Sequence, residues 1–385
     1  MLDTHIAIIG AGPGGLTLGR LLQLRNIPFV IYEKDSSPTA RQEGGSLDLQ
    51  PDSGQRAMKA AGLWDQFNEV ARYQGQDFKL MDKHGKIHIS HVSTEAERDR
   101  PEVDRKVLRK LLLESVGSEA VRWDWKLNHV SGPREDGRYG LQFMGREEVV
   151  VADMVVGADG ARSVVRELVS DVVPVYSSCT MVELRFCDVE IRHPDVSQLV
   201  GRGSLGSYSY DRALMGQRNG DGSIRIYVLL RTPESWVDDC GIDFSVPQNT
   251  REGLLKHFED WNEGLKALIS KCDDQGIIGR PLYALPIGHS WITKPNITLI
   301  GDSAHLMTPF AGQGVNLAML DALLLSDAII KNGADLKNAI VEYEEDMFER
   351  VYVWAQHSAN NLELMLAKNA PKGFADLVRQ YMPDV

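Results

Sequence analysis

The sequence predicts an α/β fold, in which a Rossmann-like dinucleotide-binding domain carries an inserted antiparallel β-sheet domain and a long C-terminal helix. Three observations predict it. The chain opens with a strand, a glycine turn, a helix and a second strand; residues 172–285 form successive strand patterns; and a helical pattern covers residues 335–366. A strand–helix–strand unit places parallel strands side by side, whereas consecutive strands joined by tight turns pair antiparallel.

The opening stretch is a βαβ unit. We expect strands at 5–9 and 27–32, a helix at 16–25, and between them the turn Gly10-Ala11-Gly12-Pro13-Gly14-Gly15. Gly10 permits the tight turn, Gly12 lets the backbone approach a pyrophosphate, and Gly15 lets the helix pack closely on the strand. The free N–H groups at the helix N-terminus then face the phosphates. This spacing predicts a dinucleotide site.

Glu33 follows the second strand, about 20 residues after the glycine turn, where a carboxylate can accept hydrogen bonds from ribose hydroxyls. Its charge would repel the 2′-phosphate of NADP. The motif alone does not choose among NAD, NADP and FAD, and the alternative is a glycine-rich turn that binds no ligand.

Composition and charge exclude several function classes. The 385 residues can bury the cores of two domains, and the net charge of −12 argues against a nucleic-acid or anionic-membrane surface. The four cysteines lack CxxC spacing, so we expect neither a metal site nor a disulfide framework. The first strand begins almost at residue 1 and no apolar run could cross a bilayer, so we expect a cytoplasmic protein without a signal peptide or membrane insertion.

A polar loop over 34–43 leads to the pair Gly44-Gly45, which suits a mobile or closely packed backbone, or a plain hairpin turn. The next expected elements are a helix from Asp52 or Ser53 to Ala61, a hairpin of strands 77–81 and 86–90, a helix over 106–115, and strands at 120–125, 127–130, 139–144 and 147–151.

A second stretch with a cofactor-like pattern lies at 153–163. A buried strand ends in the turn Gly157-Ala158-Asp159-Gly160, after which we expect a helix that runs to Val169. A strand that ends in a glycine turn opening a helix again suits a bound cofactor.

Residues 172–285 predict the inserted antiparallel sheet. Strands are expected at 180–188, 204–210, 212–218, 223–230 and 277–285, with helices near Trp236 and within 251–270. The turn Asn219-Gly220-Asp221-Gly222 is a strong hairpin signal, because both dipeptides suit positive φ. Residues 201–206 also fit GxGxxG, but no strand precedes them and no helical pattern follows, so we expect no second dinucleotide unit.

A third informative stretch begins with a buried strand that ends at Gly301-Asp302. A loop with Pro309 follows, and Gly312-Gln313-Gly314 opens a helix that Gly333 ends. A glycine-rich helix N-terminus allows close approach of a ligand and stabilises negative charge.

These three stretches, in this order, resemble the motifs of group A flavin-dependent monooxygenases, the para-hydroxybenzoate hydroxylase fold. The opening turn is similar to their FAD ADP-binding motif, residues 157–160 to a motif associated with FAD and NADPH, and Gly301-Asp302 to a motif whose Asp meets the ribityl chain. Within that family, residues 44–49, 100–105 and 301–316 are most similar to the tetracycline-inactivating monooxygenases. The resemblance spans nearly the whole chain.

The resemblance implies FAD contacts at Glu33, Lys34, Asp48, Arg105 and Asp302, with Lys34 standing where the family has Arg. The full set of candidate cofactor residues is Gly10, Gly12, Pro13, Gly14, Gly15, Glu33, Lys34, Gly45, Asp48, Arg105, Asp159, Asp302, Pro309, Gly312, Gly314, Val315 and Asn316. Since no second nucleotide domain is expected, the flavin would move to meet NADPH, and Gly44-Gly45 is the candidate backbone for that motion.

Four residues are candidates for substrate contacts. Glu183 stands where the tetracycline enzymes carry Gln, Arg225 where they carry His, and Arg212 matches an Arg that contacts substrate. Phe310 could line the cavity beside the flavin ring or belong to the core. The departures at Glu183 and Arg225 favour a substrate other than tetracycline.

The resemblance implies an FAD- and NADPH-dependent monooxygenase that hydroxylates an electron-rich polycyclic enol or phenol through a flavin hydroperoxide, with tetracycline as the leading substrate and antibiotic inactivation as the role. The flavin carries the chemistry, so no catalytic side chain is assigned, and His305 beside Asp302 is interpreted as a structural hydrogen-bonding residue. The alternatives are a hydroxylase of another aromatic or polyketide substrate, a non-catalytic flavin-fold binding protein, and a flavin reductase acting on isoprenoid double bonds.

The predicted domain division follows from these patterns. The FAD-binding domain would comprise 1–75, 101–171 and 291–333, the substrate-binding domain 76–100 and 172–290, and the C-terminal helix and polar tail 334–385. The helix can lie across both domains, which favours a monomer.

Overall fold

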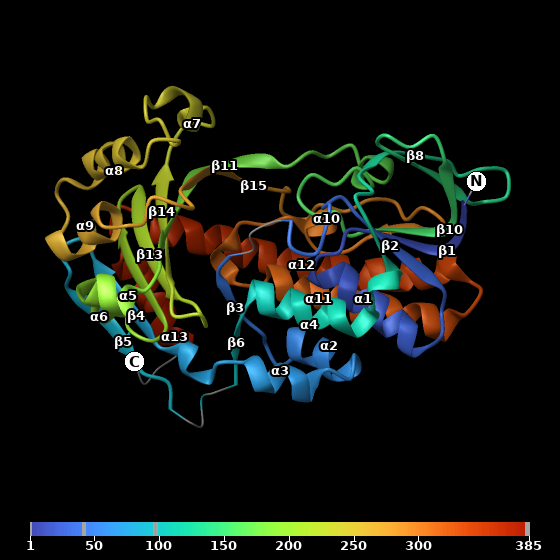
Figure 1. Cartoon of the computed structure of the whole chain (residues 1–385), viewed down its shortest axis with the longest axis horizontal. Coiled ribbons are helices and arrows are strands. Elements are labelled where there is room, and N and C mark those ends of the chain that lie inside the picture. The colour runs from blue at the N-terminus through green and yellow to red at the C-terminus, as the bar shows by residue number, and fades with distance from the viewer. Residues whose placement is uncertain (1, 41–43, 95–96, 98, 382–385) are drawn as a thin grey trace.

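The computed structural model describes residues 2–40, 44–94, 97 and 99–381. Within this range two seven-stranded sheets and one two-stranded sheet form the framework (Figure 1). The end of the expected loop at 34–43 and the end of the expected C-terminal tail lie outside the described residues. The predicted fold class is confirmed.

The first sheet has the strand order β7-β2-β1-β10-β9-β8, and β16 pairs with β10. Its strands are β1 (Leu2–Ile9), β2 (Phe29–Glu33), β7 (Val121–Trp123), β8 (Leu127–Ser131), β9 (Tyr139–Phe143), β10 (Val149–Gly157) and β16 (Ile297–Leu299). Strands β2, β1, β10 and β16 pair parallel. Their carboxyl ends therefore meet at one edge of the sheet, and the three glycine turns follow these ends.

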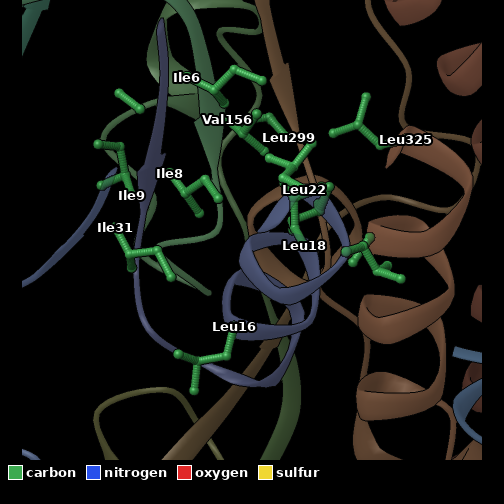
Figure 2. Packing of buried hydrophobic residues seen from close by; sticks show 14 of the residues in the cluster. Ile6, Ile8, Ile9, Leu16, Leu18, Leu22, Ile31, Val156, Leu299 and Leu325 are labelled. Carbon is green, nitrogen blue, oxygen red and sulfur yellow. The ribbon is translucent and has the colours of Figure 1, made fainter. Parts of the chain in front are cut away.

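Helices bury the first sheet. They are α1 (Pro13–Leu24), α2 (Gly54–Ala60), α3 (Trp64–Val70), α4 (Arg105–Val116) and α11 (Gly314–Asn332). Leu18 and Leu22 of α1 repeat at helical spacing and point into the same core as Leu299 of β16 and Leu325 of α11 (Figure 2). This packing fixes the N-termini of α1 and α11 relative to the sheet edge.

The second sheet has the order β15-β11-β14-β13-β12-β4-β5. Its strands are β4 (Phe78–Asp82), β5 (Ile87–His91), β11 (Val175–Phe186), β12 (Ser204–Ser209), β13 (Arg212–Arg218), β14 (Ile224–Arg231) and β15 (Ile278–Ala284). It is antiparallel except where β4 pairs parallel with β12. The expected hairpin at 77–90 thus joins this sheet, as does the hairpin around Asn219.

The two faces of the second sheet have different coverings, because successive side chains along a strand point to opposite faces. The outer face, with Leu184, Leu214 and Ile226, packs on the core of α8 (Pro247–Leu255) and α9 (Glu263–Ser270). The inner face, with Ala213 and Leu229, packs on Phe310 and the C-terminal helices. Shorter helices α5 (Val189–Arg192), α6 (Pro194–Val200) and α7 (Trp236–Asp239) complete this region.

The long helix α12 (Leu336–Met365) contributes to both parts of the molecule. Ile340 and Met347 belong to the core of the first sheet, whereas Leu362 and Met365 belong to the core on the inner face of the second sheet. Figure 1 shows α12 between the first sheet at the right and the second sheet at the left. The predicted domain boundaries stay a prediction.

A two-stranded antiparallel sheet of β3 (Ser46–Asp48) and β6 (Glu102–Asp104) was not predicted, since three-residue strands leave little pattern. The short helices α3, α5 and α6 were also missed.

The expected helix after Gly160 is wrong. The Asp159 carboxylate accepts hydrogen bonds from the Val164 N–H and the Ser163 hydroxyl, and a single 3-10 turn, Arg166–Leu168, follows. The expected polar tail contains a further helix, α13 (Lys372–Tyr381), which buries Phe374. The two strands expected at 147–151 and before Gly157 form one continuous strand, β10 (Val149–Gly157).

Candidate active site

The first glycine turn packs tightly on the second one. Gly10 has φ +112°, and a Cβ there would lie 2.3 Å from the carbonyl oxygen of Ala158, while a Cβ on Gly15 would lie 2.1 Å from the Gly10 carbonyl. Around Gly12, by contrast, no described atom lies within 4 Å of a Cβ position. Gly10 and Gly15 are therefore needed for packing, and Gly12 leaves open space at the N-terminus of α1.

Glu33 lies at the end of β2 and is only 3% exposed. Its Oε2 accepts a 2.7 Å hydrogen bond from the Ala11 N–H and its Oε1 a 3.0 Å bond from the Asp35 N–H. The carboxylate thus contacts the glycine turn, and the exposed Lys34 follows it. The expected contact of Glu33 with a ribose stays a prediction.

Arg109 was missed by the sequence analysis. Its guanidinium donates to the carbonyl oxygens of Ala11 (3.1 Å) and Pro38 (3.0 Å) and lies 3.4 Å from the Asp35 carboxylate. It therefore connects the glycine turn to the loop after β2. The available signal was its position one helical turn beyond Arg105 on the same helix.

The second and third motifs are joined by another arginine that was not predicted. Arg166 donates to the carbonyl oxygens of Ala161 (2.7 Å) and Ser303 (3.1 Å). Burial raises the pKa of Asp159, although the Ser163 hydroxyl and backbone N–H groups oppose the rise. The Asp159 carboxylate therefore stabilises its own turn through these hydrogen bonds.

Asp302 is exposed in the first turn of α10 (Asp302–His305), and it is not paired with His305. His305 is buried, and its Nε2 lies 2.6 Å from Asp321, which also accepts a bond from the Gly301 N–H. Burial alone would raise the pKa of Asp321, but His305 and Arg350 hold it below its usual range. The structural interpretation of His305 agrees with these contacts.

Asn316 fastens α11 to the segment that carries Asp48. Its Oδ1 accepts bonds from the backbone N–H groups of Gln50 (2.9 Å) and Gly54 (3.3 Å), and its Nδ2 donates to the Asp48 carbonyl at 2.9 Å. Asn316 is fully buried. Its side chain thus acts as a structural clamp.

Two carboxylates flank the N-terminus of α11. An oxygen of Asp48 lies 3.9 Å from the Cβ position of Gly312, and an oxygen of Asp302 lies 3.9 Å from that of Gly314. Pro309, which begins the preceding 3-10 turn, is exposed, and Val315 is half-buried. The third motif therefore presents glycine backbone between two acidic side chains.

The Gly44-Gly45 turn packs against the inner face of the second sheet. A Cβ on Gly44 would lie 2.1 Å from Cζ of Arg225, and Gly45 (φ +77°) brings its Cβ position to 2.8 Å from the Tyr227 hydroxyl. Arg225 forms an ion pair with Glu183. These contacts favour the closely packed backbone among the interpretations of this turn.

The substrate candidates separate into two groups. Glu183, Arg225 and Phe310 lie on the inner face of the second sheet or against it. Arg212 lies on the outer face, where its Nη2 is 3.1 Å from Asp260 and its Nη1 donates to the His257 carbonyl. The structure therefore does not bring Arg212 together with the other three, because its side chain takes the opposite side of β13.

Glu102 is a buried carboxyl between the small sheet and the second sheet. Its Oε2 lies 3.5 Å from the Gln217 amide and 3.6 Å from Arg72. Burial raises the pKa of Glu102 to about 7, and Ser46 and Arg72 only partly oppose this rise. No local sequence pattern points to Glu102, because its surroundings come from three separate segments.

Comparison with known proteins decides the family. A model of the FAD binding domain family matches residues 3–233 and 290–346. The chain belongs to this family. Two relatives of this flavoprotein are the monooxygenase penA of Penicillium thymicola, 30% identical, and the monooxygenase asqM of Emericella nidulans, 29% identical. The alignments cover 98% of this chain and 98% of penA, and 97% and 98% for asqM. The protein is thus a member of the FAD-dependent monooxygenases.

Solved structures share the fold of this monooxygenase at low identity. Klebsiella pneumoniae HpxO, solved with FAD and uric acid, has a TM-score of 0.80 and 19% identity, covering 98% of this chain and 93% of that chain. The tetracycline destructase Tet(55) has a TM-score of 0.76 and 18% identity, covering 100% and 96%.

The glycine turns and their neighbouring donors fit a bound FAD. Gly12 leaves open space beside the helix N–H groups, as a bound pyrophosphate requires, and the carboxylate of Glu33 lies at the same turn. In the described part of the chain no three His, Cys, Asp or Glu side chains gather as metal ligands. None of the described helices combines the length and apolar character that crossing a bilayer requires.

Proposed function

We propose that this monooxygenase uses NADPH and O2 to hydroxylate an electron-rich aromatic or polycyclic enol substrate, with tetracycline as the first compound to test. The observation that carries the proposal is the meeting of three glycine turns at one sheet edge, opposite the inner face that holds Glu183 and Arg225. The reaction consumes NADPH, a proton and O2, and yields NADP⁺, water and a product with one new C–O bond.

The cofactor residues take distinct parts in the proposal. The N–H groups of Gly12, Gly14 and Gly15 would bind the pyrophosphate, and Glu33 would bind the adenosine ribose. Asp302 and Arg105 hold the ribityl chain. Gly312–Gly314 at the N-terminus of α11, together with Gly45 and Asp48, would hold the ring, because glycine leaves room there and the helix dipole favours negative charge on a reduced ring.

Bound FAD supplies the redox chemistry and the activation of O2. The chain itself supplies placement and exclusion of water. Phe310 and Leu229 belong to one buried apolar cluster on the inner face, which would exclude water from this side of the site. Arg225 can donate to an oxygen of the substrate ring and orient it.

The alternative functions differ in their substrate and in whether NADPH is consumed. The tetracycline destructase neighbour shares the fold, while Glu183 and Arg225 favour another aromatic or polyketide substrate. A non-catalytic binding protein would retain the fold but consume no NADPH. We further propose a cytoplasmic monomer, because α12 already joins the two cores within one chain.

The decisive experiment measures NADPH consumption by the FAD-loaded protein in air, with and without tetracycline, and the mass of the drug. Faster consumption with the gain of one oxygen atom supports both chemistry and substrate. Consumption without drug modification supports the monooxygenase and redirects the search to other phenols and enols. A flavin-loaded protein that consumes no NADPH with any such compound contradicts the proposal.

A further inference from the structure

One side of the long helix α12 follows the third motif. The Tyr343 hydroxyl donates to the Leu299 carbonyl at 2.9 Å, at the end of β16. Further along the helix, Arg350 donates to Asp321 at 3.0 Å, and the same carboxylate accepts the Gly301 N–H at 2.8 Å. Because about seven residues make two helical turns, Tyr343 and Arg350 lie on the same side of α12. This side therefore runs beside the start of the third motif.

Ser358 lies about two turns beyond Arg350 and forms a reciprocal pair with Thr308. Its hydroxyl donates to the Thr308 carbonyl, and the two hydroxyl oxygens lie 2.7 Å apart. A hydroxyl has one proton to donate, so the Thr308 hydroxyl is the donor in the second bond. Ser358 is fully buried and Thr308 is 6% exposed. Two hydrogen bonds sheltered from water therefore fix the backbone immediately before Pro309.

Asn361 binds a second backbone carbonyl of the same loop. Its Nδ2 donates to the Phe310 carbonyl at 2.9 Å. The Pro309 carbonyl, between the two that α12 binds, accepts the Gly312 N–H at 3.2 Å within the 3-10 turn. Leu362, the next residue of α12, belongs to the same buried cluster as the Phe310 ring. Adjacent residues of α12 thus hold both the backbone and the side chain of Phe310.

The loop has one side bonded to α12 and one open side. Thr308 and Phe310 are buried and bonded to α12, whereas Pro309 and Gly312 are exposed. Gly312 (φ +65°) leads directly into the N-terminus of α11. A shift of the loop would therefore move its open side relative to the N–H groups of α11, which stabilise negative charge.

We propose that Ser358 and Asn361 are positioning residues for the flavin ring, because they fix the loop whose open side would hold the ring at the N-terminus of α11. The inference rests on the proposed function, since it concerns the same flavin site. A reduced ring carries more negative charge than an oxidised one and depends more on the helix N-terminus. Loosening the loop should therefore weaken the binding of reduced FAD more than that of oxidised FAD, which lowers the reduction potential of the bound flavin.

The test measures three properties of each variant: the melting temperature without flavin, the dissociation constant for FAD, and the reduction potential of bound FAD by equilibration with a redox dye. Asn361→Ala and Ser358→Ala should each raise the dissociation constant roughly five-fold. Each should lower the potential by about 30 mV, which corresponds to a ten-fold loss of preference for reduced FAD. Asn361→Gln keeps an amide donor and should recover part of both effects.

Asn360→Ala is the matched control, because Asn360 is exposed on the same helix, and it should change neither property. A contact that only stabilises the fold affects oxidised and reduced FAD alike, so its loss leaves the potential unchanged. An unchanged potential in Asn361→Ala and Ser358→Ala, or an equal shift in Asn360→Ala, overturns the inference. Asn361 is half-buried, so Asn361→Ala should fold and carry the test even if the variant of the buried Ser358 does not.

The inference and the proposed function can fail separately. A shifted potential in a protein that consumes no NADPH supports the positioning role and contradicts the proposed function. An unchanged potential in variants of a protein that oxygenates tetracycline contradicts the positioning role and supports the proposed function. A protein that binds no FAD contradicts both.

Discussion

Single side chains decide how the flavin region meets the inner face. Gly44 is the sharpest case, because the guanidinium of Arg225 occupies the space that any Cβ would need. A flexible arginine could normally move away at little cost. Here it is buried and paired with Glu183, so that displacement would separate a buried ion pair.

We therefore expect Gly44→Ala to lower the free energy of unfolding by about 1–3 kcal/mol through overpacking. Denaturant unfolding measures this loss. The double variant Gly44→Ala with Arg225→Ala removes the clash, so its two changes should not be additive. Strictly additive losses would show that Gly44 and Arg225 do not interact.

Glu102 makes the free energy of unfolding depend on pH. Its pKa is about 7 in the folded protein against an ordinary value of 4.5, so the folded state binds more protons between these values. Stability therefore falls as pH rises from about 4.5 through 7, by roughly 3 kcal/mol in total from this group. Glu102→Gln keeps the shape without the titration. Its unfolding free energy should decline less between pH 5 and pH 8 than that of the wild type, and identical slopes would contradict the assignment.

At the scale of elements, the Glu344 carboxyl attaches helix α12 to neighbouring segments through hydrogen bonds. Glu344 is fully buried and accepts hydrogen bonds from Trp291 (3.0 Å), Thr293 (2.5 Å) and Thr298 (2.7 Å). Burial raises the pKa of Glu344, against the effect of these donors. The helix is thereby fixed to β16 and to the segment that precedes it.

Glu344→Ala should cost about 3 kcal/mol or more, because it leaves several buried donors without a partner. Glu345→Ala is the matched control on the same helix, since Glu345 is exposed, and should change stability by less than about 0.5 kcal/mol. Thermal unfolding of the two variants side by side makes the comparison. Similar melting temperatures would show that Glu344 does not fasten the helix.

Elements with local signals were predictable from sequence. The βαβ opening, the hairpin at Asn219 and the helix that ends at Gly333 depend on glycine position and apolar periodicity, which neighbouring residues determine. The face on which Arg212 lies was not predictable, because a shift of one residue in strand alignment reverses every side chain. The contacts of Arg225 and Arg109 join segments far apart in the chain, and no local pattern records them.

At the scale of the whole molecule, FAD binding and folding should be linked through the edge where β1, β10 and β16 end. A ligand that binds only the folded protein stabilises it by about 2.7 kcal/mol when its free concentration is 100 times the dissociation constant. Added FAD should therefore raise the melting temperature of the flavin-free protein in a concentration-dependent way.

The variant Gly12→Asp tests whether FAD binding can be lost while the flavin-free protein keeps its stability. Gly12 has φ −79° and ψ 178°, a conformation open to any residue, and no described atom lies within 4 Å of its Cβ position. The flavin-free variant should melt close to the flavin-free wild type, yet its carboxylate would repel the pyrophosphate, so FAD should no longer raise the melting temperature. A variant that melts much lower without FAD would show that Gly12 is needed for folding. A variant stabilised by FAD as strongly as the wild type would place the pyrophosphate elsewhere.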